Sequence, residues 1–285
     1  MKMSIQYNAR VLFKSIKRDF TTYKRYRAFF LGFILEMVSL TLGFALFGGA
    51  YFFNPEVLSY IGLAESDVFI FLLSGAIIQL FSSVATWAPL NRVENDIHYG
   101  TIEAIFVTPA SRMSYLLSTT ITRGIIGFVF FLPLYVLTLG IGGVLTNGAV
   151  IGYTLLIALI TLISNVAVGL YFGMFAMLFR QARIFISMTH QLIQFLFGAF
   201  LPVQGFMVLH KGFGTAMKYL TLAFPFTYNF DLMRHFMFGD KYLTLIDWRL
   251  EFIILGALTV MYFVLARVLL IFVEKKAKKQ GLAIL

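Results

Sequence analysis

The sequence predicts an all-α membrane protein with six transmembrane helices. Of its 285 residues, 60% are hydrophobic and 13% are charged, whereas a soluble domain carries about 25% charged residues. The apolar residues form continuous runs of about the 20 residues that a helix needs to cross a bilayer. The basic residues gather between those runs, mostly on one side of the expected membrane.

Six apolar runs reach the length of a membrane span. They cover approximately 28–53, 68–90, 124–144, 150–179, 184–209 and 252–273. Because the runs are continuous in Leu, Ile, Phe and Val and do not alternate with polar residues, they favour helices over barrel strands. We therefore expect a cytoplasmic segment at 1–27, a transmembrane domain at 28–273 and a cytoplasmic tail at 274–285.

The placement of Lys and Arg predicts that both termini lie in the cytoplasm. Eight basic residues precede the first run, three acids and no basic residue lie between the first and second runs, and four lysines follow the last run. Basic segments stay on the cytoplasmic side. The long segment before the last run departs from this rule, because its basic residues are only partly offset by acids. The expected location is the plasma membrane, without a cleaved signal peptide.

The N-terminal stretch 5–26 predicts an amphipathic helix at the cytoplasmic interface. Its apolar residues recur at near-helical spacing among basic ones: Ile5, Val11, Leu12, Ile16, Phe20 and Tyr23. Such a helix lies with its apolar side in the headgroup region and attracts anionic lipid, which makes membrane lipids an expected partner. The alternative is a basic flank that only fixes the orientation of the first span.

The connection 91–112 carries acids on the basic side of the membrane. These acids are Glu94, Asp96 and Glu103. Residues 101–106 favour a short helix, for which Gly100 would permit the turn and Thr101 would serve as cap, and which would end before Pro109. A helix of this kind suits contact with a soluble partner, and an ordinary solvated connector is the alternative.

The outer segment 206–247 is too apolar for a free loop, and each of its apolar stretches is too short to span. Pro225 separates two of these stretches. Backbone that is not helical is tolerated at membrane depth only where protein buries it. We therefore expect a re-entrant helical hairpin in the outer leaflet, or a hairpin packed over the bundle.

The stretch 96–112, DIHYGTIEAIFVTPASR, resembles the cytoplasmic signature of the type-2 ATP-binding-cassette (ABC-2) permeases. The positions that match the signature are Asp96, Gly100, Thr101, Glu103, Thr108, Pro109 and Arg112. Ile102 replaces the usual Leu, and His98 stands where an acid is common. A second stretch, AFPFTYNFDLMRHFMFG, follows Leu201-Pro202 and resembles the outer region of that family. Its matching positions, with Pro202, are Pro225, Thr227, Tyr228, Asp231, Arg234 and Gly239.

The resemblance implies the permease subunit of an exporter of a drug, a lipid or a lipid-linked glycan. A separate ATPase subunit would bind ATP and Mg²⁺, and a second permease protomer, identical or a paralogue, would complete the transporter. Residues 100–106 would dock into a groove of the ATPase, with Glu94, Asp96 and Glu103 as ion-pair partners. This chain itself lacks the G-x-x-x-x-G-K-[ST] phosphate loop, so we expect it to bind no cofactor.

Catalytic and metal-binding patterns are missing from the sequence. It contains no cysteine, no H-E-x-x-H or G-x-S-x-G motif, and four dispersed histidines. We therefore expect no catalytic residue, no metal site, no enzymatic activity and no nucleic-acid partner. Polar residues in the spans are costly. Glu36, Gln191 and Gln194 either line a substrate path or fix the packing of the helices.

Two other classes of protein compete with an ATP-driven permease. A stand-alone secondary transporter or channel would carry more ionisable residues in its spans and internal repeats, and neither is evident in the sequence. A membrane-embedded enzyme that acts on lipids would need clustered acids or histidines near one interface, which the sequence also lacks.

Overall fold

The computed structural model describes residues 5–25, 55–108, 111–179 and 181–280, and a few positions between 31 and 43. Within those ranges every regular element is a helix, and no β-strand is present. The predicted all-α class is therefore confirmed for this part of the chain. The predicted first span, 28–53, lies mainly outside the described residues, and Glu36 is among those outside.

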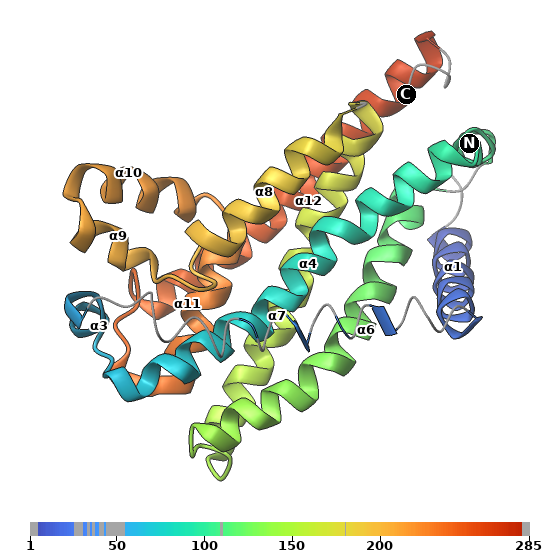
Figure 1. The fold of residues 1–285 in the computed structure, drawn as a ribbon. Coiled ribbons are helices and arrows are strands. Elements are labelled where there is room, and N and C mark those ends of the chain that lie inside the picture. The colour runs from blue at the N-terminus through green and yellow to red at the C-terminus, as the bar shows by residue number, and fades with distance from the viewer. Residues whose placement is uncertain are drawn as a thin grey trace.

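Four long helices form the body of the described structure: α4 (Val68–His98), α6 (Arg112–Ile141), α7 (Gly148–Leu178) and α12 (Trp248–Gln280). Each contains a segment that is long and apolar enough to cross a membrane. Helix α7 packs against the other three, so it holds them together (Figure 1). These helices include the predicted spans 68–90 and 252–273 and nearly all of 124–144 and 150–179.

The range 184–209, which we predicted as one span, is two helices in the structure. Helix α8 (Ala182–Leu196) stops after 15 residues, a length of about 22 Å at 1.5 Å per residue. A bend at residues 197–202 leads into α9 (Val203–Leu209). Gly198 has φ +99°, which glycine adopts freely, and Pro202 cannot donate a backbone hydrogen bond. These two residues explain why the helix does not continue.

Shorter helices surround this body. Helix α1 (Ile5–Arg25) packs against α6, and α3 (Pro55–Ile61) packs against α9. Helices α9 and α10 (Lys211–Leu222) pack against each other and project from the side of the long helices, away from α1 (Figure 1). Helix α11 (Pro225–Phe238) returns to the bundle and contacts α4, α7 and α12.

Helix α4 continues past the end of its apolar run. Its last turns, from Asn91 to His98, belong to the connection that we predicted to follow the span as a loop. Val93 in this extension is fully buried, and Arg92 forms an i,i+4 ion pair with Asp96. Both features stabilise helix, which is why the polar sequence does not end it. After Gly100 the chain forms the predicted short helix, α5 (Ile102–Val107).

Candidate functional site

The connection 91–112 turns sharply at Gly100. The amide of Gly100 donates to Ile97 O at 3.1 Å, and the amide of Thr101 donates to Asp96 O at 2.9 Å. Gly100 has φ +66°, a left-handed conformation that commonly ends helices and favours glycine. A Cβ atom at this position would meet no other atom within 4 Å. The glycine is therefore required by the backbone conformation and not by a lack of space.

Asp96 lies beneath this turn, with 9% of its surface exposed. The hydroxyl of Thr101 donates to Oδ1 at 2.7 Å, the hydroxyl of Tyr115 donates to Oδ2, and Nε of Arg92 lies 2.7 Å from Oδ2. The expected capping role of Thr101 is wrong, because its side chain makes no cap hydrogen bond and holds Asp96 instead. These contacts leave Asp96 poorly placed to pair with a partner protein.

The same network reaches helix α1. Oδ2 of Asp19 accepts a hydrogen bond of 3.3 Å from the hydroxyl of Thr119 in α6, and Oδ1 lies 3.8 Å from Nη1 of Arg92. A chain of polar contacts thus joins α1, α4, α6 and the turn before α5. Sequence reasoning missed Asp19, Arg92, Tyr115 and Thr119. One signal was present, because Asp19 is the single acid in the basic segment 1–27.

Helix α5 is anchored on one side and exposed on the other. Ile102 is buried and belongs to the hydrophobic core. Glu103 and Thr108 are exposed, and large apolar side chains flank them, since Tyr99 is 73% exposed and Val107 is 85% exposed. Acidic and apolar groups on a fixed helix form a surface that suits a protein partner.

Two other predicted residues of this connection have separate roles. Glu94 accepts from Nε of Arg183 at 2.9 and 3.0 Å, which ties the start of α8 to α4. Arg112 is the first residue of α6, a helix that Ser111 caps by accepting from Ser114 N at 3.3 Å. Pro109 lies outside the described residues.

Asp96→Asn is expected to loosen the turn before α5. Breaking a buried ion pair costs about 3–5 kcal/mol, and because Arg92 keeps a fifth of its side chain exposed we expect a loss of about 2 kcal/mol. Thermal unfolding measures this loss, and hydrogen exchange at residues 99–107 locates it. Glu94→Gln is the matched control, because its pair is exposed and worth less than about 1 kcal/mol. Equal effects of the two changes would contradict the buried role of Asp96.

One of the predicted outer residues, Arg234, contacts the bend between α8 and α9. Arg234 of α11 is 1% exposed. Its guanidinium donates to the carbonyl of Gly198, to that of Ala199 at 2.7 Å, and stacks on the Phe71 ring at 3.6 Å. Carbonyls outside a regular helix have no intrahelical partner, and leaving them buried without a donor is costly. Arg234 therefore satisfies two carbonyls of the bend that follows α8.

Asp231, one turn before Arg234, holds the segment that leads into α12. Its carboxylate accepts from the Tyr242 hydroxyl at 2.5 Å, the Leu245 amide at 2.7 Å and the Gln204 side chain at 3.4 Å. Burial and the charge of Asp231 raise the pKa of Tyr242 well above its ordinary value, so this phenol remains a donor. Sequence reasoning missed Tyr242 in this site, because it lies outside the matching stretch.

Two predicted prolines lie where α9 and α11 begin. Pro202 directly precedes α9, and Pro225 is at the start of α11, where its missing amide hydrogen costs nothing. Tyr228 donates to the carbonyl of Leu222 at 2.9 Å, which joins the start of α11 to the end of α10. These contacts make the outer motif a structural joint.

Of the three predicted substrate-path residues, the structure describes the side chain of Gln191. Gln191 is exposed on α8. The side chain of Gln194 and the whole of Glu36 lie outside the described residues.

No protein-family model matches this sequence. A search of curated proteins also finds no match. The site must therefore be interpreted from its own geometry and from the sequence motifs.

Proposed function

We propose that this chain is the permease subunit of an ATP-binding-cassette exporter in the plasma membrane. A separate ATPase subunit binds ATP and Mg²⁺ and docks on the exposed side of α5. Two permease protomers, identical or paralogous, enclose the path of a drug, a lipid or a lipid-linked glycan. The chain crosses the membrane six times with both termini in the cytoplasm, and α9 and α10 form a re-entrant region in the outer leaflet.

The observation that carries this proposal is the rigid connection from α4 to α5. Helix α4 runs without interruption from its apolar segment to His98, and the network around Asp96 fixes the turn that follows. A displacement of α5 by a partner is therefore transmitted to α4 and α6. Asp96, the turn at Gly100 and the exposed Glu103 occupy positions of the permease signature.

Co-expression with the phosphate-loop ATPase encoded nearest to this chain tests the proposal. We expect the two proteins to purify as a complex whose ATPase activity responds to at least one compound in a panel of lipids, glycans and drugs. An ATPase that neither binds this chain nor responds to it would contradict the proposal.

The double variant Gly100→Val and Glu103→Arg tests the coupling role of α5. We expect ATP-driven transport to fall by more than about tenfold, because backbone strain at position 100 shifts α5 and the new charge opposes docking. Transport into proteoliposomes is the measurement, with circular dichroism to verify the helices. Glu65→Arg, at an exposed site distant in sequence, is the charge-matched control. Unchanged transport in the double variant would contradict the coupling role of α5.

A stand-alone secondary transporter remains the second candidate, because one observation favours it. Asp231, Arg234 and Glu251 are all buried, and buried ionisable groups are typical of ion-coupled transport. Each of them bonds to at least one backbone group, which fits a structural role better. Substrate flux in proteoliposomes that contain this chain alone, driven by an ion gradient, would favour the transporter instead.

A further inference from the structure

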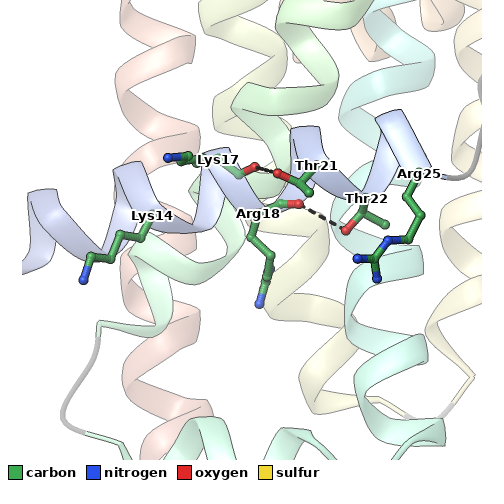
Figure 2. A pocket seen from close by; sticks show the side chains of 6 residues that line it. All are labelled: Lys14, Lys17, Arg18, Thr21, Thr22 and Arg25. Carbon is green, nitrogen blue, oxygen red and sulfur yellow. Dashed lines mark hydrogen bonds between the residues drawn. The ribbon is translucent and has the colours of Figure 1, made fainter.

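One side of α1 carries a dense group of cationic side chains that the proposed function does not use. Six residues line a hollow of about 420 Å³ on this side: Lys14, Lys17, Arg18, Thr21, Thr22 and Arg25. Each lies three or four residues from another member of the group, so they share one face. Figure 2 shows these side chains along α1, with Lys14, Arg18 and Arg25 extending away from the helix. We call them the basic face of α1.

The cationic groups of the basic face are available to a ligand, whereas its two hydroxyl groups already donate to the backbone. The hydroxyl of Thr21 donates to Lys17 O at 2.8 Å, and that of Thr22 donates to Arg18 O at 3.1 Å (Figure 2). Among the described residues, Arg18 is the member of the face that forms an ion pair, with Asp19 at 3.0 Å. A ligand here would therefore be recognised by ammonium and guanidinium groups, which select anions and above all phosphate.

The contacts of α1 place it where the apolar parts of the long helices end. Asp19 contacts Arg92 of α4 and Thr119 of α6. The apolar run of α4 ends two residues before Arg92, and that of α6 begins five residues after Thr119. Helix α1 also lies across the long helices (Figure 2), as a helix in the plane of a membrane surface would. This level of a bilayer contains the lipid phosphates.

The other exposed side of α1 carries two aromatic side chains together with Lys24. Phe13 is 71% exposed and Phe20 is 37% exposed, and helical geometry sets them about 100° or more from Lys14 and Arg18 around the axis. A helix with aromatic residues on one side and cations on another binds at the boundary between acyl chains and headgroups. Apolar contact and charge thus favour the same occupant, which is the membrane itself.

We propose that the basic face of α1 binds the phosphate groups of an anionic phospholipid in the cytoplasmic leaflet. Zwitterionic lipids carry a phosphate too, but their ammonium group cancels its charge, so the site prefers lipids with net negative charge. Arg18 gives the site a connection to the rest of the molecule, because Asp19, its ion-pair partner, also contacts Arg92 beside Asp96. The proposal rests on the membrane orientation of the proposed function and needs no ATPase.

The test measures lipid enrichment around the full chain. The protein is placed in nanodiscs of phosphatidylcholine that contain a minor fraction of spin-labelled phosphatidylglycerol, without any ATPase. We expect the labelled lipid to be immobilised preferentially by the protein and to be released by high salt. Arg25→Gln should weaken this preference about fivefold, since each basic residue near an anionic surface contributes about a fivefold factor. The fourfold variant, with Gln at positions 14, 17, 18 and 25, should lose most of the preference.

Matched variants keep the outcomes distinct. A control variant removes the same charge from the other end of the molecule and should leave the lipid preference intact. It carries Gln in place of Lys211, Lys218, Lys241 and Arg249. The double variant Lys14→Arg and Lys17→Arg should also keep it, which separates loss of charge from misfolding. Equal loss in both fourfold variants, or no loss in either, would overturn the proposal.

Two further outcomes would assign the basic face to another ligand. Displacement of the labelled lipid by inorganic phosphate as readily as by phosphatidylglycerol would mean that the site takes a soluble anion. A fourfold variant that keeps the lipid preference but no longer purifies with the ATPase would mean that the face binds that protein. The lipid measurement omits the ATPase. A negative result for lipid binding is therefore distinct from a negative result for the proposed function.

Discussion

Gly75→Ala is expected to prevent α4 from packing against the bend at residues 197–202. A Cβ atom at position 75 would lie 1.7 Å from the carbonyl oxygen of Ala199 and 2.8 Å from Nη2 of Arg234. The first of these atoms belongs to backbone and cannot rotate away, so α4 and the bend would have to separate. We expect a loss of stability of about 3 kcal/mol or more, measured as the yield of monodisperse protein and its thermal unfolding temperature.

Gly256→Ala is the control for this substitution. Gly256 also lies in a long apolar helix, α12, and a Cβ atom there would meet nothing within 4 Å. Alanine favours helix over glycine by about 0.5–1 kcal/mol, so this variant should be as stable as the original protein or more stable. If Gly75→Ala were equally well tolerated, the close contact between α4 and the bend would be wrong.

Arg234→Met is expected to destabilise the same joint by a different route. Methionine fills similar space but leaves the carbonyls of Gly198 and Ala199 buried without donors. Each unsatisfied group costs about 1–3 kcal/mol, and removal of a buried charge offsets part of this, so we expect a net loss of about 2–4 kcal/mol. Thermal unfolding in detergent measures the loss, and hydrogen exchange should increase at residues 196–203.

Arg234→Lys and Arg249→Met complete this experiment. Lysine keeps the charge but lacks the planar fork that reaches two carbonyls, so Arg234→Lys should fall between the original protein and Arg234→Met. Arg249 is exposed, and its loss should change stability by less than about 0.5 kcal/mol. A lysine variant as unstable as the methionine variant would show that shape, and not donation to the carbonyls, is what the joint requires.

The α4–α6 connection shows how far local sequence rules extend. The turn at Gly100 and the short helix after it were predictable, because a glycine at φ +66° and a helical hexapeptide depend on neighbouring residues. The helical continuation from Asn91 to His98 was not, because it depends on burial of Val93 against other helices. The partners of Asp96 were likewise hidden, since Tyr115 lies 19 residues away.

The outer region shows the limit of reading spans from hydropathy. Residues 184–209 are apolar enough to predict one span, and only the fold reveals that α8 ends at Leu196. A helix can stop inside an apolar run when other groups satisfy its free carbonyls. Here Arg234, 36 residues beyond Gly198, donates to carbonyls of the bend that follows α8, so no local pattern predicts the break.

The sequence by itself determined the helical class of the described part of this protein, the apolar segments of α4, α6, α7 and α12 that are long enough to cross a membrane, and the turn before α5. These features follow from composition and from periodicities within one helix or one turn. The tertiary structure decided which polar groups are paired. It placed Asp96, a candidate docking group, in a network of buried contacts, and it made the motif residue Arg234 the donor to the bend that follows α8. Both outcomes depend on contacts between segments far apart in the chain, which are set by packing and not by neighbouring residues.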